Sequence, residues 1–304
     1  SFSPEASGGF YAIGGHQQVI ESDHDNDGNP EPVFLSNIQS NYSTSIVWAD
    51  WTASGGITTS APIQTCDNAS SISVGDINGD GADDIVSFSL NTGMACIHMA
   101  NGSSYDPLQN QTVSSSLIAA ELGDIDSDGV AEIISISSGG SLSYQSWNNS
   151  TGLTYVSNQT VEMNGSAGMP AGLTSLYVDD FFGTGDTSAL IMDQTGHWTL
   201  WQDFNGMWGG PITRFDDISM AEMLADLDGD GDLDVIGLNE QGYAFRINDG
   251  SKWDLTSFQA QIDLLNSTIV DFDNDGNLDL MNPNPGISDG VASTVEGNIT
   301  LRTI

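Results

Sequence analysis

Aspartates recur at every second position in one short stretch of this chain. The nine residues DLDGDGDLD, at 226–234, contain five of them. Like charges this close repel one another, and such a run usually marks a solvated loop. Alternate side chains of a tight loop can also converge on one cation, and a set of hard oxygen ligands suits calcium. Magnesium would need a smaller, stricter octahedron and would keep more of its waters.

The same spacing recurs along the chain. Its other copies are DHDNDGNPE at 23–31, DINGDGADD at 76–84, DIDSDGVAE at 124–132, DFDNDGNLD at 271–279 and a degenerate DFFGTGDTS at 180–188. In the pattern D-x-[DN]-x-D-G-x-x-[DE], side chains at positions 1, 3, 5 and 9 surround a cation, and the carbonyl of position 7 adds another oxygen. Gly at position 6 permits the sharp turn. A merely solvated acidic face does not explain this fixed spacing, which predicts about five Ca²⁺ ions.

The pattern assigns the ligands residue by residue. The predicted side-chain ligands are, site by site, Asp23, Asp25, Asp27 and Glu31; Asp76, Asn78, Asp80 and Asp84; Asp124, Asp126, Asp128 and Glu132; Asp226, Asp228, Asp230 and Asp234; and Asp271, Asp273, Asp275 and Asp279. The predicted carbonyl ligands are those of Asn29, Ala82, Val130, Asp232 and Asn277. The copy at 180–188 has Phe182 and Thr184 where acids are needed, so we expect a turn there without calcium.

An EF-hand is the obvious rival for an acidic loop of this kind. It needs a bidentate Glu at position 12 and helices on both sides. Position 12 of the five full motifs is Phe34, Ser87, Ser135, Gly237 and Asn282. None of these is Glu and the flanking segments have the pattern of strands, so we reject the EF-hand.

The segments around each motif predict the elements that position it. A short hydrophobic stretch leads into the motif and another follows, as in SISVG and DIVSFSL around 76–84. A Gly comes next, and in four repeats a further strand runs into an NG, TG or DG turn before a last strand; NG and DG are strong hairpin signals. The motifs are 45–56 residues apart, close to the length of a four-stranded propeller blade. No stretch has convincing helical periodicity.

These repeats resemble the FG-GAP/VCBS repeat, the unit of the integrin α-subunit β-propeller. The resemblance rests on the acidic motifs, their trailing strands and the hairpin turns, and it covers residues 18–285. It implies that each calcium loop joins two neighbouring strands of a blade on one face of the disc. Family members are mostly extracellular adhesion receptors, lectins and accessory domains of secreted enzymes, so the resemblance implies the fold and calcium more directly than an activity.

The expected architecture is a single all-β domain, a six-bladed β-propeller over residues 1–304, with seven blades as the alternative. The expected blades are 18–71, 72–117, 118–173, 174–220, 221–265, and 266–304 completed by 1–17. We expect FYAIGGHQQVI (10–20) and GNITLRTI (297–304) to be strands that close the ring together. Alternatively, a terminal strand pairs with another copy of the chain and forms a polymer.

The composition excludes several classes of partner. The chain has 304 residues, only four Lys and Arg together, and a net charge of −38. Nucleic acid and anionic membrane surfaces are excluded as partners, because binding them needs clustered Lys and Arg. No apolar run approaches the 18 residues of a transmembrane helix. Five calcium ions would bring the charge to about −28, and the remaining excess suits a salty medium that screens repulsion.

Other features place the chain outside the cell or on its surface. Two alternatives stay open for Cys66 and Cys96, namely two buried thiols or one disulfide formed in an oxidising compartment. Asn-x-Ser/Thr sequons mark candidate glycosylation sites at Asn41, Asn68, Asn101, Asn110, Asn148, Asn149, Asn158, Asn164, Asn266 and Asn298. Their number is about twice what this composition would produce by chance, which favours a glycoprotein.

No motif for catalysis is found. The four histidines have no transition-metal spacing, and nucleophile elbows and phosphate-binding glycine loops are absent from the sequence. We expect His24, inside the first motif, to point to solvent. Most tryptophans are expected to pack between blades, and Trp201 and Trp208 beside an NG turn are the best candidates for a sugar-stacking surface. The expected function is adhesion or recognition of a protein or glycan partner. The alternatives are a structural subunit of a surface filament or layer, made of copies of this chain, and an accessory domain of a secreted enzyme.

Overall fold

The computed structural model of the chain shows β-sheets throughout the part that it describes. That part comprises residues 16–28, 31–38, 43–51, 57–161, 173–193, 198–203, 208–215, 220–239, 242–250, 252–258, 268–270, 279–282 and 300–303. Every regular element in these residues is a strand, and no helix occurs among them. The predicted all-β class is therefore confirmed for the described chain.

Four sheets repeat one antiparallel unit, in which strands pair in chain order. The second sheet contains β6 (Ser71–Gly75), β7 (Asp84–Ser89), β8 (Met94–His98) and β9 (Gln109–Thr112). The third contains β10 (Leu117–Gly123), β11 (Glu132–Ser137), β12 (Ser141–Asn148) and β13 (Gly152–Thr160). The fourth contains β14 (Leu173–Asp179), β15 (Ser188–Asp193), β16 (Trp198–Asp203) and β17 (Trp208–Phe215), and the fifth β18 (Met220–Ala225), β19 (Asp234–Asn239), β20 (Gly242–Asn248) and β21 (Trp253–Phe258).

The first and last sheets are variants of this unit. The first contains β1 (His16–Ser22), β2 (Glu31–Ile38), β3 (Ser43–Trp51), β4 (Ile57–Thr59) and β5 (Ile63–Gln64). Here β4 and β5 both pair with β3 and share the place of a fourth strand. The last contains β22 (Thr268–Val270), β23 (Asp279–Asn282) and β24 (Thr300–Thr303), and β24 pairs with β23 in parallel.

The turns follow the glycines that the repeat pattern singled out. Gly93 and Gly140 join the second and third strands of their sheets at φ 69° and 76°. Gly102 and Gly250, in the NG and DG turns before the outer strands, have φ 82° and 73°. Only Gly adopts this left-handed region without steric cost, so these positions end one strand and reverse the chain into the next. The predicted hairpins are confirmed at both turns.

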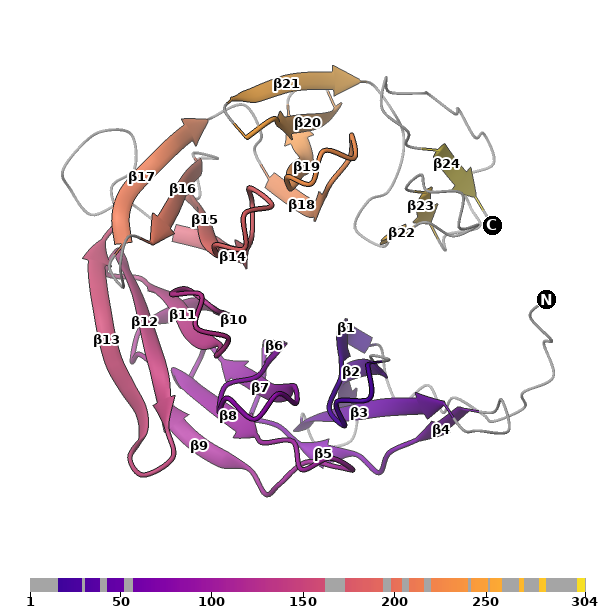
Figure 1. Cartoon of the computed structure of the whole chain (residues 1–304), viewed down its shortest axis with the longest axis vertical. Coiled ribbons are helices and arrows are strands. Elements are labelled where there is room, and N and C mark those ends of the chain that lie inside the picture. The colour runs from indigo at the N-terminus through magenta and orange to yellow at the C-terminus, as the bar shows by residue number, and fades with distance from the viewer. Residues whose placement is uncertain are drawn as a thin grey trace.

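The sheets follow one another around a common centre, as Figure 1 shows. The first strands of consecutive sheets lie on the inside and are neighbours, β1 beside β6, β6 beside β10 and β10 beside β14. The later strands lie progressively further out, with β9, β13, β17 and β21 at the rim. Sheets arranged in this way form a β-propeller-like fold.

The hydrophobic core lies in layers between neighbouring sheets. Strand β11 shows how one strand supplies two layers, because successive side chains of a strand point to opposite faces. Ile133 packs with Val86 and Phe88 of the second sheet, whereas Ile134 packs with Ile191 of the fourth. All five of these side chains are fully buried. Each buried aliphatic side chain stabilises the folded state by about 1.5–3 kcal/mol, so the core stabilises the packing of adjacent sheets.

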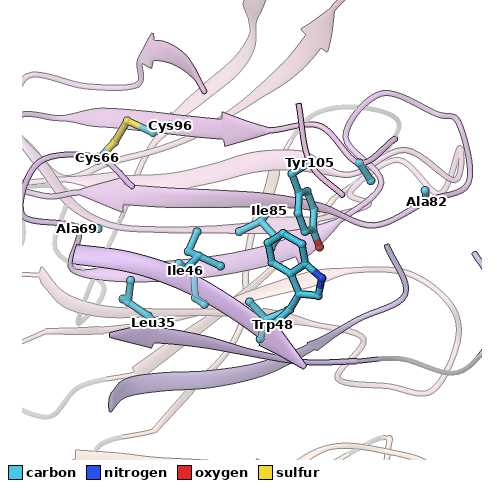
Figure 2. Close-up of a cluster of buried hydrophobic side chains, with 12 residues drawn as sticks. Leu35, Ile46, Trp48, Cys66, Ala69, Ala82, Ile85, Cys96 and Tyr105 are labelled. Carbon is cyan, nitrogen blue, oxygen red and sulfur yellow. A yellow bond between two sulfur atoms is a disulfide. The ribbon is translucent and has the colours of Figure 1, made fainter. Parts of the chain in front are cut away.

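The layer between the first two sheets contains a disulfide (Figure 2). Leu35, Ile46 and Trp48 from the first sheet pack there against Ile85 of the second. Cys66, in the connection between the sheets, is bonded to Cys96 on β8, and their Cα atoms are 5.4 Å apart. Of the two alternatives for these cysteines, the structure has the disulfide.

The terminal stretches lie in different sheets. Of residues 10–20, only the part from His16 is described, and it belongs to β1, which pairs with β2 in the first sheet. Near the other end, Thr300–Thr303 joins the last sheet as β24. The expectation that both stretches complete the last sheet is therefore wrong for residues 16–20, because they pair with β2. Residues 18–20 agree with the expected first blade, 18–71. Residues 10–15 lie outside the described chain.

Candidate functional site

All six acidic motifs occupy the same place in the fold. Each is the connection between the first and second strands of a sheet. The residue before position 1 pairs with position 9 in every ladder, and these pairs are Ser22↔Glu31, Gly75↔Asp84, Gly123↔Glu132, Asp179↔Ser188, Ala225↔Asp234 and Val270↔Asp279. Positions 1 to 8 therefore form a loop whose ends are fixed by the sheet. In Figure 1 the described loops project from the inner part of their sheets.

The aspartate at position 1 shapes the loop through the backbone. In the second motif, Asp76 accepts N–H hydrogen bonds from Gly79, Asp80 and Gly81 at 2.7, 3.1 and 2.7 Å. Asp226 accepts the equivalent three in the fifth motif, at 2.8, 3.2 and 3.0 Å. These bonds curl the loop around one carboxylate and turn the following side chains toward a common point.

Positions 4 and 6 reverse the chain. Position 6 is glycine in every motif, with φ between 85° and 97° in the five described loops. Position 4 also has positive φ, from 55° upward, and is occupied by Asn26, Gly79, Ser127, Gly183 and Gly229. Two left-handed residues separated by one ordinary residue produce a tight loop that longer β-branched side chains would strain.

Position 2 anchors the loop in the core. Ile77, Ile125, Phe181 and Leu227 are all buried there. His24 occupies this position in the first motif and is only 2% exposed, so the prediction that it points to solvent is wrong. Its ring lies 5.4 Å from that of Tyr105 and 5.6 Å from that of Trp48, and Nδ1 is 2.9 Å from Glu31 Oε2. The apolar residues at position 2 of the other motifs were the signal that could have revealed this.

Carboxylates are brought together at positions 1, 3 and 5 of the first and fifth motifs and at positions 1, 3 and 9 of the third. Three groups of acids have ligand oxygens within 4.8 Å of one another, namely Asp23, Asp25 and Asp27; Asp124, Asp126 and Glu132; and Asp226, Asp228 and Asp230. The acids at positions 3 and 5 of these groups are exposed, so a cation reaches them from solvent. Position 5 also fixes position 7, since the N–H groups of Ala82, Val130 and Asp232 donate to Asp80, Asp128 and Asp230.

The acids at position 9 are buried where each second strand begins. Asp84 and Asp234 are fully buried and Glu132 is 2% exposed. Desolvation is the main cause that raises the pKa of each of the three to about 7, and the neighbouring loop acids raise it further. Their oxygens accept backbone N–H groups of position 2, from Ile77, Ile125 and Leu227, which lowers the pKa only in part.

The chemistry of the loops fits a hard cation. A buried carboxylate surrounded by other carboxylates is costly unless a positive charge compensates it. The four Lys and Arg residues lie at 214, 246, 252 and 302, outside every motif. Carboxylate oxygens converge in three of the described loops, and an all-oxygen set is what Ca²⁺ takes. The residues present therefore fit calcium.

The degenerate fourth loop keeps the turn although positions 3, 5 and 9 carry no acid. Asp180 at position 1 accepts N–H groups from Thr184 and Gly185 at 3.1 and 2.6 Å, as its counterparts do. Position 9 is Ser188, whose Oγ is buried without a hydrogen-bond partner in the described structure. The fold therefore needs the position-1 carboxylate for the turn itself, separately from any metal.

Part of the predicted ligand set lies outside the described residues. These are Asn29 of the first motif and Asp271, Asp273, Asp275 and Asn277 of the sixth. For Asp279 the structure gives the backbone, which pairs with Val270. The sixth site stays a prediction from the sequence.

Neighbouring loops touch each other. Ala131 N–H donates to the carbonyl of Asp76 at 2.7 Å, joining the second and third loops. Ser127 Oγ donates to the carbonyl of Gly185 at 3.3 Å, joining the third and fourth. Asp83, which the sequence interpretation did not single out, joins the first and second loops through two bonds with Asp23. The described loops therefore form a continuous row from sheet to sheet.

The other predicted surface features have mixed outcomes. The described sequon asparagines Asn68, Asn101, Asn110, Asn148, Asn149 and Asn158 are all exposed, whereas Asn41, Asn164, Asn266 and Asn298 lie outside the described residues. Trp201 is 3% exposed and its Nε1 donates to Thr199, so it cannot offer a face to a sugar. Nothing is described of the side chain of Trp208.

Family models recognise the loops and their strands. The FG-GAP-like repeat model matches residues 23–87 and 226–281, which include the first, second, fifth and sixth motifs. These two regions of the chain are similar to the FG-GAP-like repeat. The resemblance to the FG-GAP repeat that was inferred from the acidic motifs is thereby confirmed for these two regions.

Solved structures are similar to this chain to different degrees. One is a lectin of Agrocybe aegerita, described for specific recognition of non-reducing terminal N-acetylglucosamine, with 16% identity, a TM-score of 0.53, and coverage of 80% of this chain and 66% of the lectin. Another is the Tc holotoxin pore of Photorhabdus luminescens, with 20% identity, a TM-score of 0.44, and coverage of 84% of this chain but 12% of the toxin chain. The lectin supports the fold alone. No curated protein sequence matches the chain. Within the described residues, no helix has the length and apolarity needed to cross a membrane.

Proposed function

We propose that this protein is an extracellular calcium-binding β-propeller that recognises a protein or glycan partner and has no catalytic role. The observation that carries the proposal is the repeated loop, in which carboxylate oxygens gather at positions 1, 3 and 5 in the first and fifth motifs and at positions 1, 3 and 9 in the third. The position-9 acids of the first, second, third and fifth motifs are buried. The sequence contains the full motif five times, so we infer five equivalent cation sites. The finer architecture that we propose is a closed ring of six blades.

Calcium would act on the stability of the hairpins. It would neutralise carboxylates that otherwise repel one another, and it would compensate the buried position-9 acids such as Asp234. Because position 9 begins the second strand and position 1 follows the first, a bound ion would brace the two inner strands of each sheet. The ion's chemistry here is structural: it supplies charge and coordination, and the chain supplies the fixed oxygens.

Recognition is favoured over catalysis because each group of three acids that lies close enough to hold a metal ion, among the described residues, belongs to one of the loops. The similar lectin is described as binding non-reducing terminal N-acetylglucosamine, which makes a glycan a reasonable first class of ligand to test. The identity of 16% carries no residue of that lectin's site to this chain. A protein partner is the other candidate.

A glycan array in calcium and in chelator tests the recognition role. We expect binding of a restricted set of glycans in calcium and its loss after chelation. If the protein binds no glycan but captures a defined protein partner, its ligand is a protein. Turnover of secreted polymers by the pure protein would contradict the proposal and favour an enzyme.

A structural subunit of a surface filament or layer is the second candidate. The observation that favours it is β24, which pairs in parallel with β23 in a sheet that otherwise repeats an antiparallel unit. Such a strand could be exchanged between copies of the chain. Light scattering of the native protein separates the two candidates, because a monomer supports a ring closed within one chain, whereas large assemblies support a polymer.

Glycosylation would support the extracellular location. Asn68 lies in the connection between β5 and β6, and Asn101 in the turn before β9; Asn110 and Asn158 lie on the outer strands β9 and β13. All four side chains are exposed and distant in sequence from the acidic loops. We expect intact-mass spectrometry of the native protein to show glycan mass at these positions, and Asn→Gln variants to lose it one site at a time. A native mass equal to that of the bare chain would remove this support.

A further inference from the structure

Asp83 links the first two acidic loops although it belongs to neither predicted ligand set. It occupies position 8 of the second loop. Its Oδ2 accepts the backbone N–H of Asp23 at 2.8 Å, and its own N–H donates to the carbonyl of Asp23 at 3.1 Å. The peptide groups on both sides of Asp23 are therefore held by one residue of the neighbouring sheet.

The link consists of a backbone hydrogen bond and a side-chain hydrogen bond. A similar backbone hydrogen bond joins other pairs of neighbouring loops. Ala131 N–H donates to the carbonyl of Asp76 at 2.7 Å, and Leu233 N–H donates to that of Phe181 at 3.2 Å. The side-chain half does not recur, because position 8 is Pro30, Ala131, Thr187, Leu233 or Leu278 in the other motifs. Asp83 is thus the only carboxylate at position 8 of the six motifs, and it links the first and second loops.

Asp23 is the residue that shapes the first loop. Its carboxylate accepts the N–H groups of Asp27 and Gly28 at 2.9 and 3.0 Å, and its oxygens belong to the cluster with Asp25 and Asp27. The position of the Asp23 backbone therefore sets where the oxygens of the first loop converge. On the other side of the link, Asp83 directly precedes Asp84, the buried position-9 acid of the second loop.

We propose that Asp83 is a positioning residue that couples cation binding in the first loop to cation binding in the second. An ion that fixes Asp84 orders Asp83, and Asp83 then holds the Asp23 backbone in the geometry that the first ion needs. Coupling of this kind is reciprocal, so each occupied loop raises the affinity of the other. This inference rests on the proposed calcium function.

The test follows each loop separately by NMR. With ¹⁵N-glycine labelling, the amides of Gly28, Gly81 and Gly129 report position 6 of the first, second and third loops during a Ca²⁺ titration. Asp83→Ala removes the acceptor for the Asp23 N–H. Asp83→Asn is the matched control, because its side-chain oxygen keeps the acceptor while the charge is lost in both variants. Asp80→Ala removes a predicted ligand of the second loop without touching the first.

The coupling predicts a specific shift of the calcium midpoint in each variant. Asp83→Ala shifts the Gly28 midpoint to about 3- to 10-fold higher calcium, the effect of one lost hydrogen bond, relative to Asp83→Asn. Asp80→Ala shifts the Gly28 midpoint upward by about 5-fold or more. In both variants the Gly129 midpoint stays at its wild-type value, which shows that the third loop and the fold are intact.

Two failures can be told apart. If no glycine amide of any loop responds to calcium in the wild-type protein, the proposed calcium function fails. If the loops respond but Gly28 keeps one midpoint in Asp83→Ala, Asp83→Asn and Asp80→Ala alike, the calcium function stands and the coupling through Asp83 is overturned.

Discussion

Glu121, a partly buried acid outside the loops, shows what a single residue contributes to the contact between two sheets. Glu121 lies on β10, and its carboxylate accepts the N–H of Val178 on β14 at 2.9 Å. Burial is the main cause that raises the pKa of Glu121 to about 7, and nearby Asp179 raises it further. Burial between the two inner strands therefore favours the protonated form of the carboxyl group.

Glu121 makes a pH-dependent contribution with a definite sign. Its pKa in the folded chain is raised from the usual 4.5 to about 7, so between these values the folded state binds more protons than the unfolded state. Stability is then lost as the pH rises through this window. Because Gln keeps the acceptor for Val178 and removes the charge, Glu121→Gln should raise the unfolding free energy at about pH 8 by at most about 3 kcal/mol.

Urea unfolding at about pH 5 and pH 8, at one calcium concentration, measures this effect. The gain from Glu121→Gln should shrink toward pH 5. Asp67→Asn serves as the control, because it neutralises an exposed carboxyl and should change little at either pH. A Glu121→Gln variant with the same gain at both pH values would contradict the assigned cause.

His24 shows where prediction from sequence stopped at the residue scale. The nine-residue pattern locates all six loops, because ligand geometry imposes a fixed local spacing. The burial of position 2 depends on the neighbouring sheet, where Tyr105 supplies a stacking partner far along the chain. The link from Asp83 to Asp23 is equally non-local. Contacts across a sheet boundary leave no regular spacing in a single sequence.

At the scale of elements, the inner strands approach each other closely. A Cβ added at Gly123, the last residue of β10, would lie 2.5 Å from Val178 Cγ1 on β14. The absence of a side chain at Gly123 is therefore part of how the third sheet docks against the fourth. The strands themselves were predictable from period and turn signals, whereas this close approach was not.

Gly123→Ala should destabilise the protein by about 1–3 kcal/mol, because the methyl group overpacks the boundary between β10 and β14. Gly139→Ala is the control, since the nearest atom there would be Ser137 Oγ at 3.7 Å. Urea unfolding of both variants measures the difference. Equal urea midpoints for Gly123→Ala and Gly139→Ala would show that β10 and β14 adjust to the methyl group at little cost.

The disulfide acts on the connection between the first two sheets. Cys66 and Cys96 are 30 residues apart in sequence and belong to one buried layer. Replacing both by Ala should cost about 2–4 kcal/mol of unfolding free energy. Wild-type protein in reductant should lose a similar amount, and reductant should leave the double variant unchanged. A double variant as stable as wild type would mean that packing alone secures this connection.

At the scale of the whole molecule, charge and fold are linked through the loops. A net charge of −38 on 304 residues favours solubility and opposes compaction. The described loops form a row around one part of the molecule, so their carboxylates add to each other's repulsion between sheets as well as within them. Neutralising the loops should therefore strengthen the arrangement of the sheets and each hairpin together.

The melting temperature in calcium and in a chelator at equal ionic strength is the most direct test of the account. Binding to the folded state alone contributes about 2.7 kcal/mol per site at a free concentration of 100 times Kd, so several sites should lower the melting temperature markedly on chelation. Asp226→Asn combined with Asp228→Asn should remove part of this calcium-dependent gain, while Asp186→Asn in the degenerate loop should not. A melting temperature that is the same in calcium and in chelator would contradict the assignment of the loops as calcium sites.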